Sequence, residues 1–516
     1  MKLSIIDFMN SINCYKNFVK DLKSPILSLF LVFLSTFGLI FAENNSRVDT
    51  SIGSQSEFHV GLNSSFNPGI RRATFNQEFD HYNHSNPGAN WYALRVDSET
   101  AQSWQSQPHF LELSYLFQSG PWTLQAKGGL GRDIEAWYRD ELGSNIPQGI
   151  NELNINSTPQ AFAQYQDDYF KFKIGQYQPI FGPTPKRSVT INSELIHKGL
   201  ESRLQLGDAS MTWFWSSLDP TLSTDEKKLQ SQSLVSNARG ATYTDELKSL
   251  YMHRLDYNLG KLELGIMESI IIGGKQASFW EIQPITVYHN NYPDGYANTL
   301  LSIDFKWTQN YNTLFGEIGM DDLTGGNAES SENSSNIIAW RLGYQYERPY
   351  LGGKLKTQIE VVSVDPIYGN RDLPLLPFTQ RQVLRSNYRD MEDLEQKFVD
   401  TYVVDQPIGY LRGPDVMDYW WELSWENATW GFGYELGYLQ KGNYDFSKKY
   451  NQATNNPKGP VSPIFKELRQ TMDGFYILPW RHWSQSKIQA GFILEQDLSQ
   501  DENNFSGFFQ LTWGVI

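Results

Sequence analysis

Four consecutive residues, His289, Asn290, Asn291 and Tyr292, combine side chains that suit the recognition of a sugar. A planar amide can form paired hydrogen bonds with hydroxyl groups, and an aromatic ring offers a platform for the weakly apolar face of a sugar ring. The four residues lie in a predicted long connection, 271–296, which is rich in amides and aromatic residues. We therefore predict that this connection binds carbohydrate.

Two adjacent tryptophans, Trp420 and Trp421, form a second candidate surface, because indole rings can stack on sugar rings. The alternative explanation applies to membrane proteins in general, in which Trp and Tyr gather at both membrane–water interfaces and form aromatic girdles. A girdle accounts for most of the tryptophans of a membrane barrel, so stacking by these two residues is the less favoured hypothesis.

Two pairs of acidic residues, Asp321 with Asp322 and Asp415 with Asp418, could offer carboxylate oxygens to Ca²⁺. Neither pair has the spacing of a calcium-binding loop, and solvated acids are the favoured explanation. We predict no metal site and no cofactor.

Enzyme chemistry has little support in the sequence. It contains no Gly-x-Ser-x-Gly, His-Glu-x-x-His or P-loop motif, and its single cysteine is Cys14. We predict that the protein is not an enzyme. A barrel hydrolase that uses carboxylates such as Asp321, Asp322 or Glu317 is a third, least favoured hypothesis.

The segments that must position these residues alternate apolar and polar side chains with a period of two. Ile303, Phe305 and Trp307 share one strand face, with Asp304 and Lys306 on the other. The polar face does not suit a soluble sandwich core, so the pattern indicates a wall with one apolar and one wet side. A mean hydropathy of −0.48 excludes a helical membrane bundle, and the 14% aromatic content is sufficient for interfacial girdles.

We predict an all-β fold, a transmembrane antiparallel β-barrel of about eighteen strands with short helical elements in the long connections. The strands are expected near 57–63, 90–97, 108–117, 121–131, 159–166, 169–177, 198–206, 209–217, 249–258, 261–270, 297–309, 312–320, 335–346, 353–364, 417–426, 428–440, 486–497 and 503–513. Hairpin turns are expected at 119–120, 167–168, 207–208, 259–260, 310–311 and 426–427. Local helices are expected at 391–404 and 463–472.

This strand count has an unusual consequence for the two ends of the barrel. It places the tight turns at the end opposite to the termini, which is the reverse of an ordinary porin. We therefore expect either a further strand near 475–483 or long connections that close the periplasmic mouth.

The N-terminal region resembles a secretory leader. A continuous apolar run, 26–41, follows Lys16, Lys20 and Lys23, so residues 1–42 are interpreted as a signal peptide and 43–516 as a single barrel domain. An N-terminal membrane anchor is the alternative. The formal net charge is −15, which makes nucleic acid an unexpected partner because its binding needs a basic surface.

Several short motifs, taken in order, resemble the Wzi capsule-assembly family. They are Phe172-Lys173-Ile174-Gly175-Gln176-Tyr177, Phe181-Gly182-Pro183, Ser188-Val189-Thr190-Ile191-Asn192-Ser193, His253-Arg254-Leu255, Glu268-Ser269, Gln283-Pro284, Asn298 with Asp304, Glu317 with Asp321-Asp322, and Pro407-Ile408-Gly409-Tyr410-Leu411-Arg412-Gly413-Pro414-Asp415. The chain departs from the family pattern at Phe181, where Trp is usual, and at Thr184, which replaces a second Gly. The resemblance implies an eighteen-stranded outer-membrane barrel that acts as a lectin for capsular or related polysaccharide.

Five residues of these motifs are interpreted as structural. Gly182 and Pro183 most simply form a turn after a strand. Arg254 is expected inside the lumen, paired across its hairpin with Glu268 or with Glu263, since an unpaired buried charge is costly. Asp415 closes the last motif.

We therefore expect a monomer in the bacterial outer membrane, in contact with outer-membrane lipid and with capsular polysaccharide or exopolysaccharide. The alternative function is that of a diffusion porin. An open lumen would favour the porin, and a plugged lumen would favour the lectin.

Overall fold

The computed structural model describes residues 54–63, 65, 77–81, 91–96, 98–140, 143–154, 160–236, 245–291, 293, 295–322, 336–386, 401–446, 458–477, 487–499 and 502–512. The predicted signal peptide, 1–42, lies outside the described residues, and so do Tyr292 and the segment 391–400. None of the helices within these ranges has both the length and the apolar character needed to cross a membrane.

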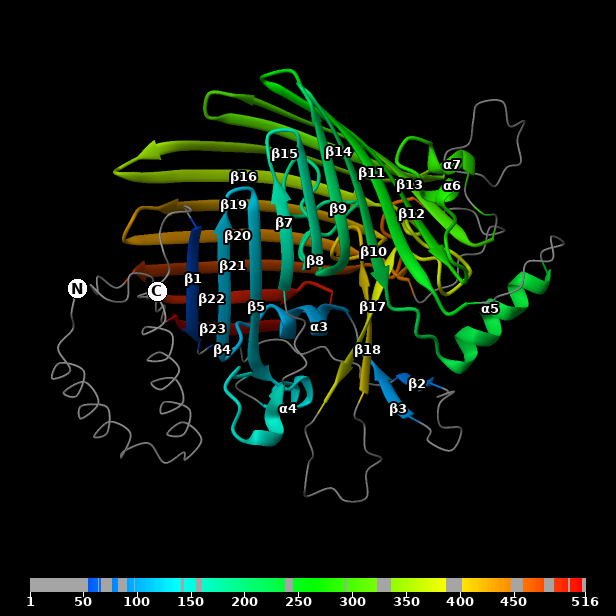
Figure 1. Cartoon of the computed structure of the whole chain (residues 1–516). Coiled ribbons are helices and arrows are strands. Elements are labelled where there is room, and N and C mark those ends of the chain that lie inside the picture. The colour runs from blue at the N-terminus through cyan, green and yellow to red at the C-terminus, as the bar shows by residue number, and fades with distance from the viewer. Residues whose placement is uncertain are drawn as a thin grey trace, which may run out of the picture. The chain divides into compact units, whose positions relative to one another are not determined.

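The main element is an all-β antiparallel barrel, as predicted (Figure 1). Eighteen long strands among the described residues form its wall. They are β1 (Ser54–Leu62), β4 (Leu111–Ser119), β5 (Trp122–Arg132), β7 (Gln160–Gln166), β8 (Phe170–Tyr177), β9 (His197–Leu206), β10 (Ala209–Leu218), β11 (Lys248–Asn258), β12 (Leu262–Gly273), β13 (Ala297–Gln309), β14 (Asn312–Asp322), β15 (Ile337–Tyr350), β16 (Gly353–Val364), β19 (Val416–Glu426), β20 (Trp430–Lys441), β21 (Phe465–Ile477), β22 (Lys487–Asp497) and β23 (Glu502–Thr512). The two-residue strand β6 (Leu153–Asn154) pairs with the end of β5.

The wall closes because β1 pairs with β4 and the last strand, β23, comes round beside them. Closure leaves no strand edge of the wall unpaired, which is the condition for a sheet to cross lipid. The six predicted hairpin turns are all observed, and Gly120 and Gly260 adopt the positive φ angles that such tight reversals favour.

Side chains alternate between the lumen and the outside. Arg254, Met267 and Asp304 are buried inside, whereas Ile266 and Ile303 on the same strands face outward and are exposed. Large apolar side chains are exposed around the outside of the wall in the same way. This is the pattern of a barrel that crosses a membrane with its strands.

Two of the predictions that determine the strand count are wrong. The segment predicted as a strand at 90–97 forms β3 (Trp91–Arg95), which belongs to a separate small sheet and not to the wall. The segment predicted as a helix at 463–472 lies largely within the wall strand β21. Its polar residues fit a strand because the lumen side of the wall accepts polar side chains.

As a result, the long connections lie at the end of the barrel opposite to the one that the predicted strand count gave. With β3 removed and β21 added, the tight turns lie at the same end as the start of β1 and the end of β23. We call this the turn end and the opposite one the long end. The arrangement is that of an ordinary porin, so the expected reversal does not occur.

A small sheet, which we call the cap sheet, is built from the long connections. It contains β17 (Thr379–Arg385), β18 (Thr401–Pro407), β3 and β2 (Gln77–His81), in the order β17-β18-β3-β2, with β18 parallel to β3. The predicted helix at 391–404 is therefore wrong for residues 401–404, which are strand. The helices within the described residues are α3 (Ser98–Gln105), α4 (Ile134–Arg139), α5 (Thr224–Ser236), α6 (Phe279–Ile282), α7 (Tyr288–Asn291) and the 3-10 helix Ile150–Glu152.

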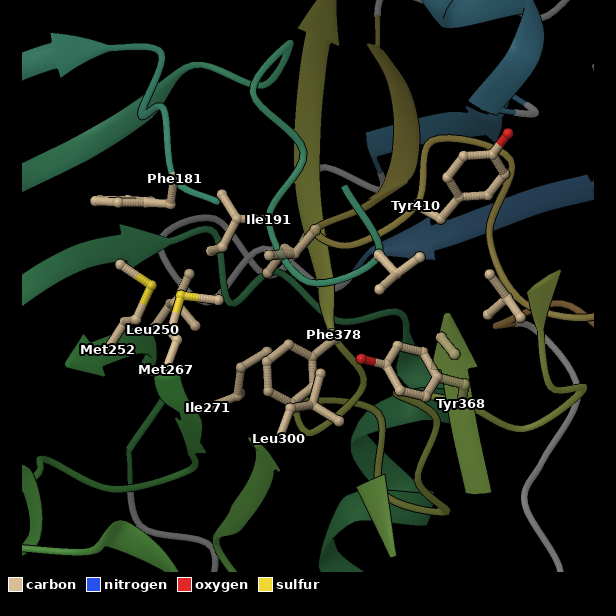
Figure 2. Close-up of a cluster of buried hydrophobic side chains, with 14 of the residues drawn as sticks. Phe181, Ile191, Leu250, Met252, Met267, Ile271, Leu300, Tyr368, Phe378 and Tyr410 are labelled. Carbon is tan, nitrogen blue, oxygen red and sulfur yellow. The ribbon is translucent and has the colours of Figure 1, made fainter. Parts of the chain in front are cut away.

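The largest apolar core lies inside the lumen (Figure 2). Connections supply Phe181 and Ile191 from 178–196, and Tyr368 and Phe378 from 365–378. They pack against inward-facing side chains of the wall such as Leu250, Met252, Met267, Ile271 and Leu300. We call the connection residues in this core the luminal plug.

Candidate functional site

The luminal plug is tied to the wall by a buried arginine of β15. Arg341 Nε lies 2.7 Å from Glu317 Oε2, and both side chains are almost completely buried. The same guanidinium donates from Nη1 to Thr184 Oγ1 at 2.8 Å and to the carbonyl of Lys186 at 2.6 Å. The connection 178–196 is therefore fixed to the wall by charged hydrogen bonds.

Glu317 also receives hydrogen bonds from the connection itself. Ser188 Oγ donates to Glu317 Oε1 at 3.0 Å, and Thr190 Oγ1 donates to the same oxygen. Gly182 has a φ of 81°, the left-handed region that glycine adopts readily, and Pro183 after it is buried. The Phe181-Gly182-Pro183 motif thus lies where the chain turns into the lumen after β8.

A second buried arginine, Arg187, fixes the same connection to β16 and β19, the wall strands that follow β15. Arg187 Nη2 lies 2.6 Å from Glu422 Oε1, and the guanidinium carbon lies 4.1 Å from the centre of the Trp420 ring. Burial alone would lower the pKa of Arg187, but the surrounding carboxylates raise it above its ordinary value and keep the group charged. Trp421 lies on the outer face of the wall, where its Nε1 donates to Thr357 Oγ1 at 3.0 Å. The two tryptophans therefore do not share a surface.

The prediction of solvated acids is wrong for Asp321, Asp415 and Asp418, which are all buried. Asp415 is fully buried and accepts the backbone N–H groups of Val461 (3.0 Å) and Tyr444 (2.8 Å). Asp321 is also buried and accepts the N–H of Gly369 at 2.8 Å. These bonds compensate for the lost hydration of the carboxylates, so both residues hold long connections in place.

The predicted partner of Arg254 is wrong. Arg254 does not pair across its hairpin with Glu268. It reaches over β12 and bonds Asp304 on β13 twice, at 2.5 and 3.0 Å, and also bonds Asp256 on its own strand at 2.7 Å. The intervening residue on β12 is Gly265, where any Cβ would collide with the guanidinium. The absence of a side chain at this position opens the path between the two strands.

A cavity with a volume of about 570 Å³ lies at the long end. Parts of β4, β5, α3, the cap sheet and residues 194–196 line it. Nine of its lining residues are amides: Asn63, Gln105, Gln107, Asn145, Asn154, Gln160, Gln178, Gln382 and Gln406. Trp104 and His109 add aromatic surface. We call this space the amide cavity.

Three glutamines join the parts of this cavity. Gln406 Nε2 donates to Gln105 Oε1 at 2.7 Å, and Gln105 Nε2 donates to Gln382 Oε1 at 2.5 Å. Its lysine and its arginine both form ion pairs. Lys127 lies 3.2 Å from Glu112, and Arg132 pairs with Glu152 and Asp140. The recognition chemistry of the cavity is therefore mainly that of uncharged donors and acceptors, to which the exposed Glu194 adds a carboxylate acceptor.

A second cavity, of about 270 Å³, lies toward the turn end. Phe181 and Gly182 of the connection 178–196 line it together with wall residues near the tight turns. Its lining is charged and includes Arg203 and the Arg254–Asp304 pair. Residues 178–196 thus separate an amide-rich space from a charged one.

The predicted sugar-binding segment lies elsewhere. His289, Asn290 and Asn291 form most of α7, are exposed, and lie on the outer face of the wall. Glu268 faces outward as well and accepts the backbone N–H groups of Tyr288 (2.6 Å) and His289 (2.8 Å). The structure does not bring these residues together with Trp420 or with the amide cavity.

The amide cavity was not predicted from the sequence, because its residues come from many separate segments. One signal was present. Gln102, Gln105 and Gln107 fall within six residues of the chain, immediately before β4. A local excess of amides next to a wall strand is the feature that could have identified this site.

No protein-family model matches the chain, and neither does any curated protein. Solved structures that it resembles include Wzi, an outer-membrane protein of Escherichia coli involved in group 1 capsule assembly and described as a carbohydrate-binding β-barrel. That match has 14% identity and a TM-score of 0.45, and it covers 88% of this chain and 84% of that one. OccK5 (OpdH) of Pseudomonas aeruginosa matches with 10% identity and a TM-score of 0.40, covering 89% of this chain and 98% of that one.

A BenF-like porin of Pseudomonas fluorescens matches with 6% identity and a TM-score of 0.38, covering 89% and 98%. The similar structures thus include a carbohydrate-binding barrel as well as porins. The choice between binding and diffusion rests on the lumen of this chain.

Proposed function

We propose that this chain is a lectin-like protein of the bacterial outer membrane that binds and retains a capsular or related surface polysaccharide. The observation that carries the proposal is the filled lumen, in which the luminal plug packs as an apolar core and is tied down by Arg187 and Arg341. A general diffusion pore needs a continuous wet path, and a close-packed apolar core does not provide one.

The amide cavity supports carbohydrate as the ligand class. It lies at the long end, which faces the cell exterior if the termini are periplasmic, and its lining combines amides with aromatic surface. Amides both donate and accept hydrogen bonds, as sugar hydroxyl groups do. The pairing of Lys127 and Arg132 with acids favours a neutral stretch of polymer over an acidic one.

A retention assay on whole cells tests this proposal. The double variant Gln105→Ala with Gln382→Ala should release polysaccharide into the medium, with at least a tenfold loss in a pull-down by the refolded barrel. Each lost hydrogen bond contributes on the order of 1 kcal/mol, and a repeating polymer multiplies the effect. Gln205→Ala, in the charged cavity, is the matched control and should bind normally.

The same assay distinguishes binding in the amide cavity from binding by α7, which contains most of the segment predicted from the sequence. The double variant Asn290→Ala with Asn291→Ala removes two exposed amides of α7. We expect it to retain polysaccharide, because α7 lies outside the lumen. If this variant releases the polymer and the cavity variant does not, the binding surface is α7 and the cavity assignment is wrong.

A further inference from the structure

The connection between β12 and β13 folds back over the outside of the barrel. Within it the α6–α7 segment, residues 275–291, packs Ile282 and Tyr288 against outward-facing side chains of β10, β11 and β12. Those wall side chains are Trp213, Trp215, Tyr251, Ile270 and Ile272. Trp213 Nε1 donates to the carbonyl of Ile282 at 3.2 Å, which fixes the segment to the wall.

The strand register establishes that this is the outer face. Tyr251 and His253 alternate with Met252 and Arg254, which are buried in the lumen. Leu255, two residues further toward the turn end, shares the outer face and is exposed. The segment therefore covers the part of the outer surface nearer the long end. The part nearer the turn end is the apolar belt of the barrel.

The covered area lies within the height that a membrane occupies. His253 is six residues from Leu259 at the tight turn. That is about 20 Å along a strand and about 15 Å along the membrane normal at the usual strand tilt, inside an apolar band of about 25 Å. His253 Nε2 lies 3.2 Å from Glu268 Oε2, and both polar groups would meet acyl chains if the wall were bare here.

The α6–α7 segment covers these two polar side chains and presents a new surface to the outside. Tyr288 stacks beside the His253 ring at 4.2 Å, and the N–H groups that begin α7 bind the Glu268 carboxylate. On its own outward side the segment presents Phe279, Trp280 and Ile285, which are 69%, 72% and 84% exposed.

We propose that the α6–α7 segment is an interfacial anchor that inserts Phe279, Trp280, Ile285 and Val287 into the acyl chains of the outer leaflet. The exposed apolar side chains continue the belt formed by Leu255, Leu264, Ile266 and Ile303 on the wall below. Trp and Phe are suited to this boundary because they combine apolar area with tolerance of a wet edge. The anchoring role does not depend on what the lumen binds.

The charge of the segment agrees with lipid as the occupant. Lys275 Nζ lies 2.6 Å from Glu281 Oε1, so its cation and its acid neutralise each other at the upper edge. The exposed polar side chains of His289, Asn290 and Asn291 lie on α7 and carry no formal charge, and the N–H of His289 binds Glu268. A segment of this composition can lie along a membrane surface without burying an unpaired charge.

Depth-dependent fluorescence quenching tests the proposal. Cys14→Ser removes the single native thiol of the full chain, and Trp280→Cys then carries one environment-sensitive label. The protein is reconstituted into phosphatidylcholine vesicles that contain acyl-chain spin-labelled lipid. Asp225→Cys is the control, because the Asp225 side chain on α5 is 92% exposed and charged.

We expect the spin-labelled lipid to quench the label at position 280 at least threefold more than the label at 225, and aqueous iodide to quench only the latter. Equal iodide quenching at both positions would overturn the proposal. Protection from both quenchers, accompanied by thiol cross-linking into dimers, would also overturn it by making a second copy the occupant. Heat-modifiable mobility reports folding, and Ile285→Cys replaces Trp280→Cys if the latter fails to fold.

Discussion

At the scale of single residues, the lumen follows one rule: each buried charge whose interactions are described above has a partner. Arg254 with Asp304, Arg341 with Glu317, and Arg187 with its carboxylates are all removed from bulk water. Breaking such a pair is costly because the remaining charge stays buried without its counterion. These arginines are therefore assigned to anchoring and not to ligand contact.

Arg254→Ala should lower the temperature at which the barrel loses its heat-modifiable mobility, with a stability loss of about 3 kcal/mol. The reason is that Asp304, which is 5% exposed, loses two hydrogen bonds and cannot regain water. Arg203→Ala is the matched control, since Arg203 is exposed in the same cavity and bonds the hydroxyl of Ser210. Polysaccharide binding should survive in both variants. Lost binding with unchanged stability would make Arg254 a ligand residue.

At the scale of elements, the cap sheet depends on an ion cluster that joins three connections. Arg381 on β17 bonds Asp405 on β18 at two sites, each 2.7 Å, and Glu226 on α5 at 2.8 and 3.1 Å. Arg95 on β3 bonds the same two acids. Burial would raise the pKa of Asp405, but Arg381 and Arg95 outweigh it and lower this pKa to about 2.

The cap sheet should therefore loosen in acid. The pKa of Asp405 is depressed from 3.8 to about 2, so its stabilisation is complete above pH 4 and is lost as the pH falls toward 2. The contribution is about 2 kcal/mol. Amide hydrogen exchange of β17 and β18, corrected for the intrinsic pH dependence, should accelerate over this interval. Asp405→Asn should exchange faster at pH 6 and show a smaller change on acidification, whereas an unchanged profile would contradict the argument.

At the scale of the whole molecule, the luminal plug decides between a pore and a closed barrel. Planar-bilayer recordings of the refolded chain should show no sustained conductance, because the apolar core and the anchored connection 178–196 occupy the lumen. Arg341→Ala removes the main tie between this connection and the wall and should produce intermittent openings. Stable open channels in the unaltered protein would instead make the diffusion porin the better function.

The sequence by itself determined the barrel. Alternation with a period of two and abrupt turns are local properties, so strands such as β12 and β13 and all six predicted hairpins could be identified from residue types alone. It could not separate β3 from a wall strand, because Trp91–Arg95 has the same local character and only its pairing with β18 assigns it to the cap sheet. Nor could it identify β21, because its charges are compatible with a strand only once one face of that strand is known to line the lumen.

Only the tertiary structure shows how the residues of the candidate site come together. The partner of Arg254 lies two strands away and is reached across Gly265. The amide cavity collects side chains from segments that are as far apart in sequence as Asn63 and Gln406. Alternation gives each strand its two faces, but it does not predict the course of a long connection. Residues 178–196 return into the lumen, whereas the α6–α7 segment folds over the outside. That choice depends on contacts between residues distant in the chain, and no local pattern encodes them.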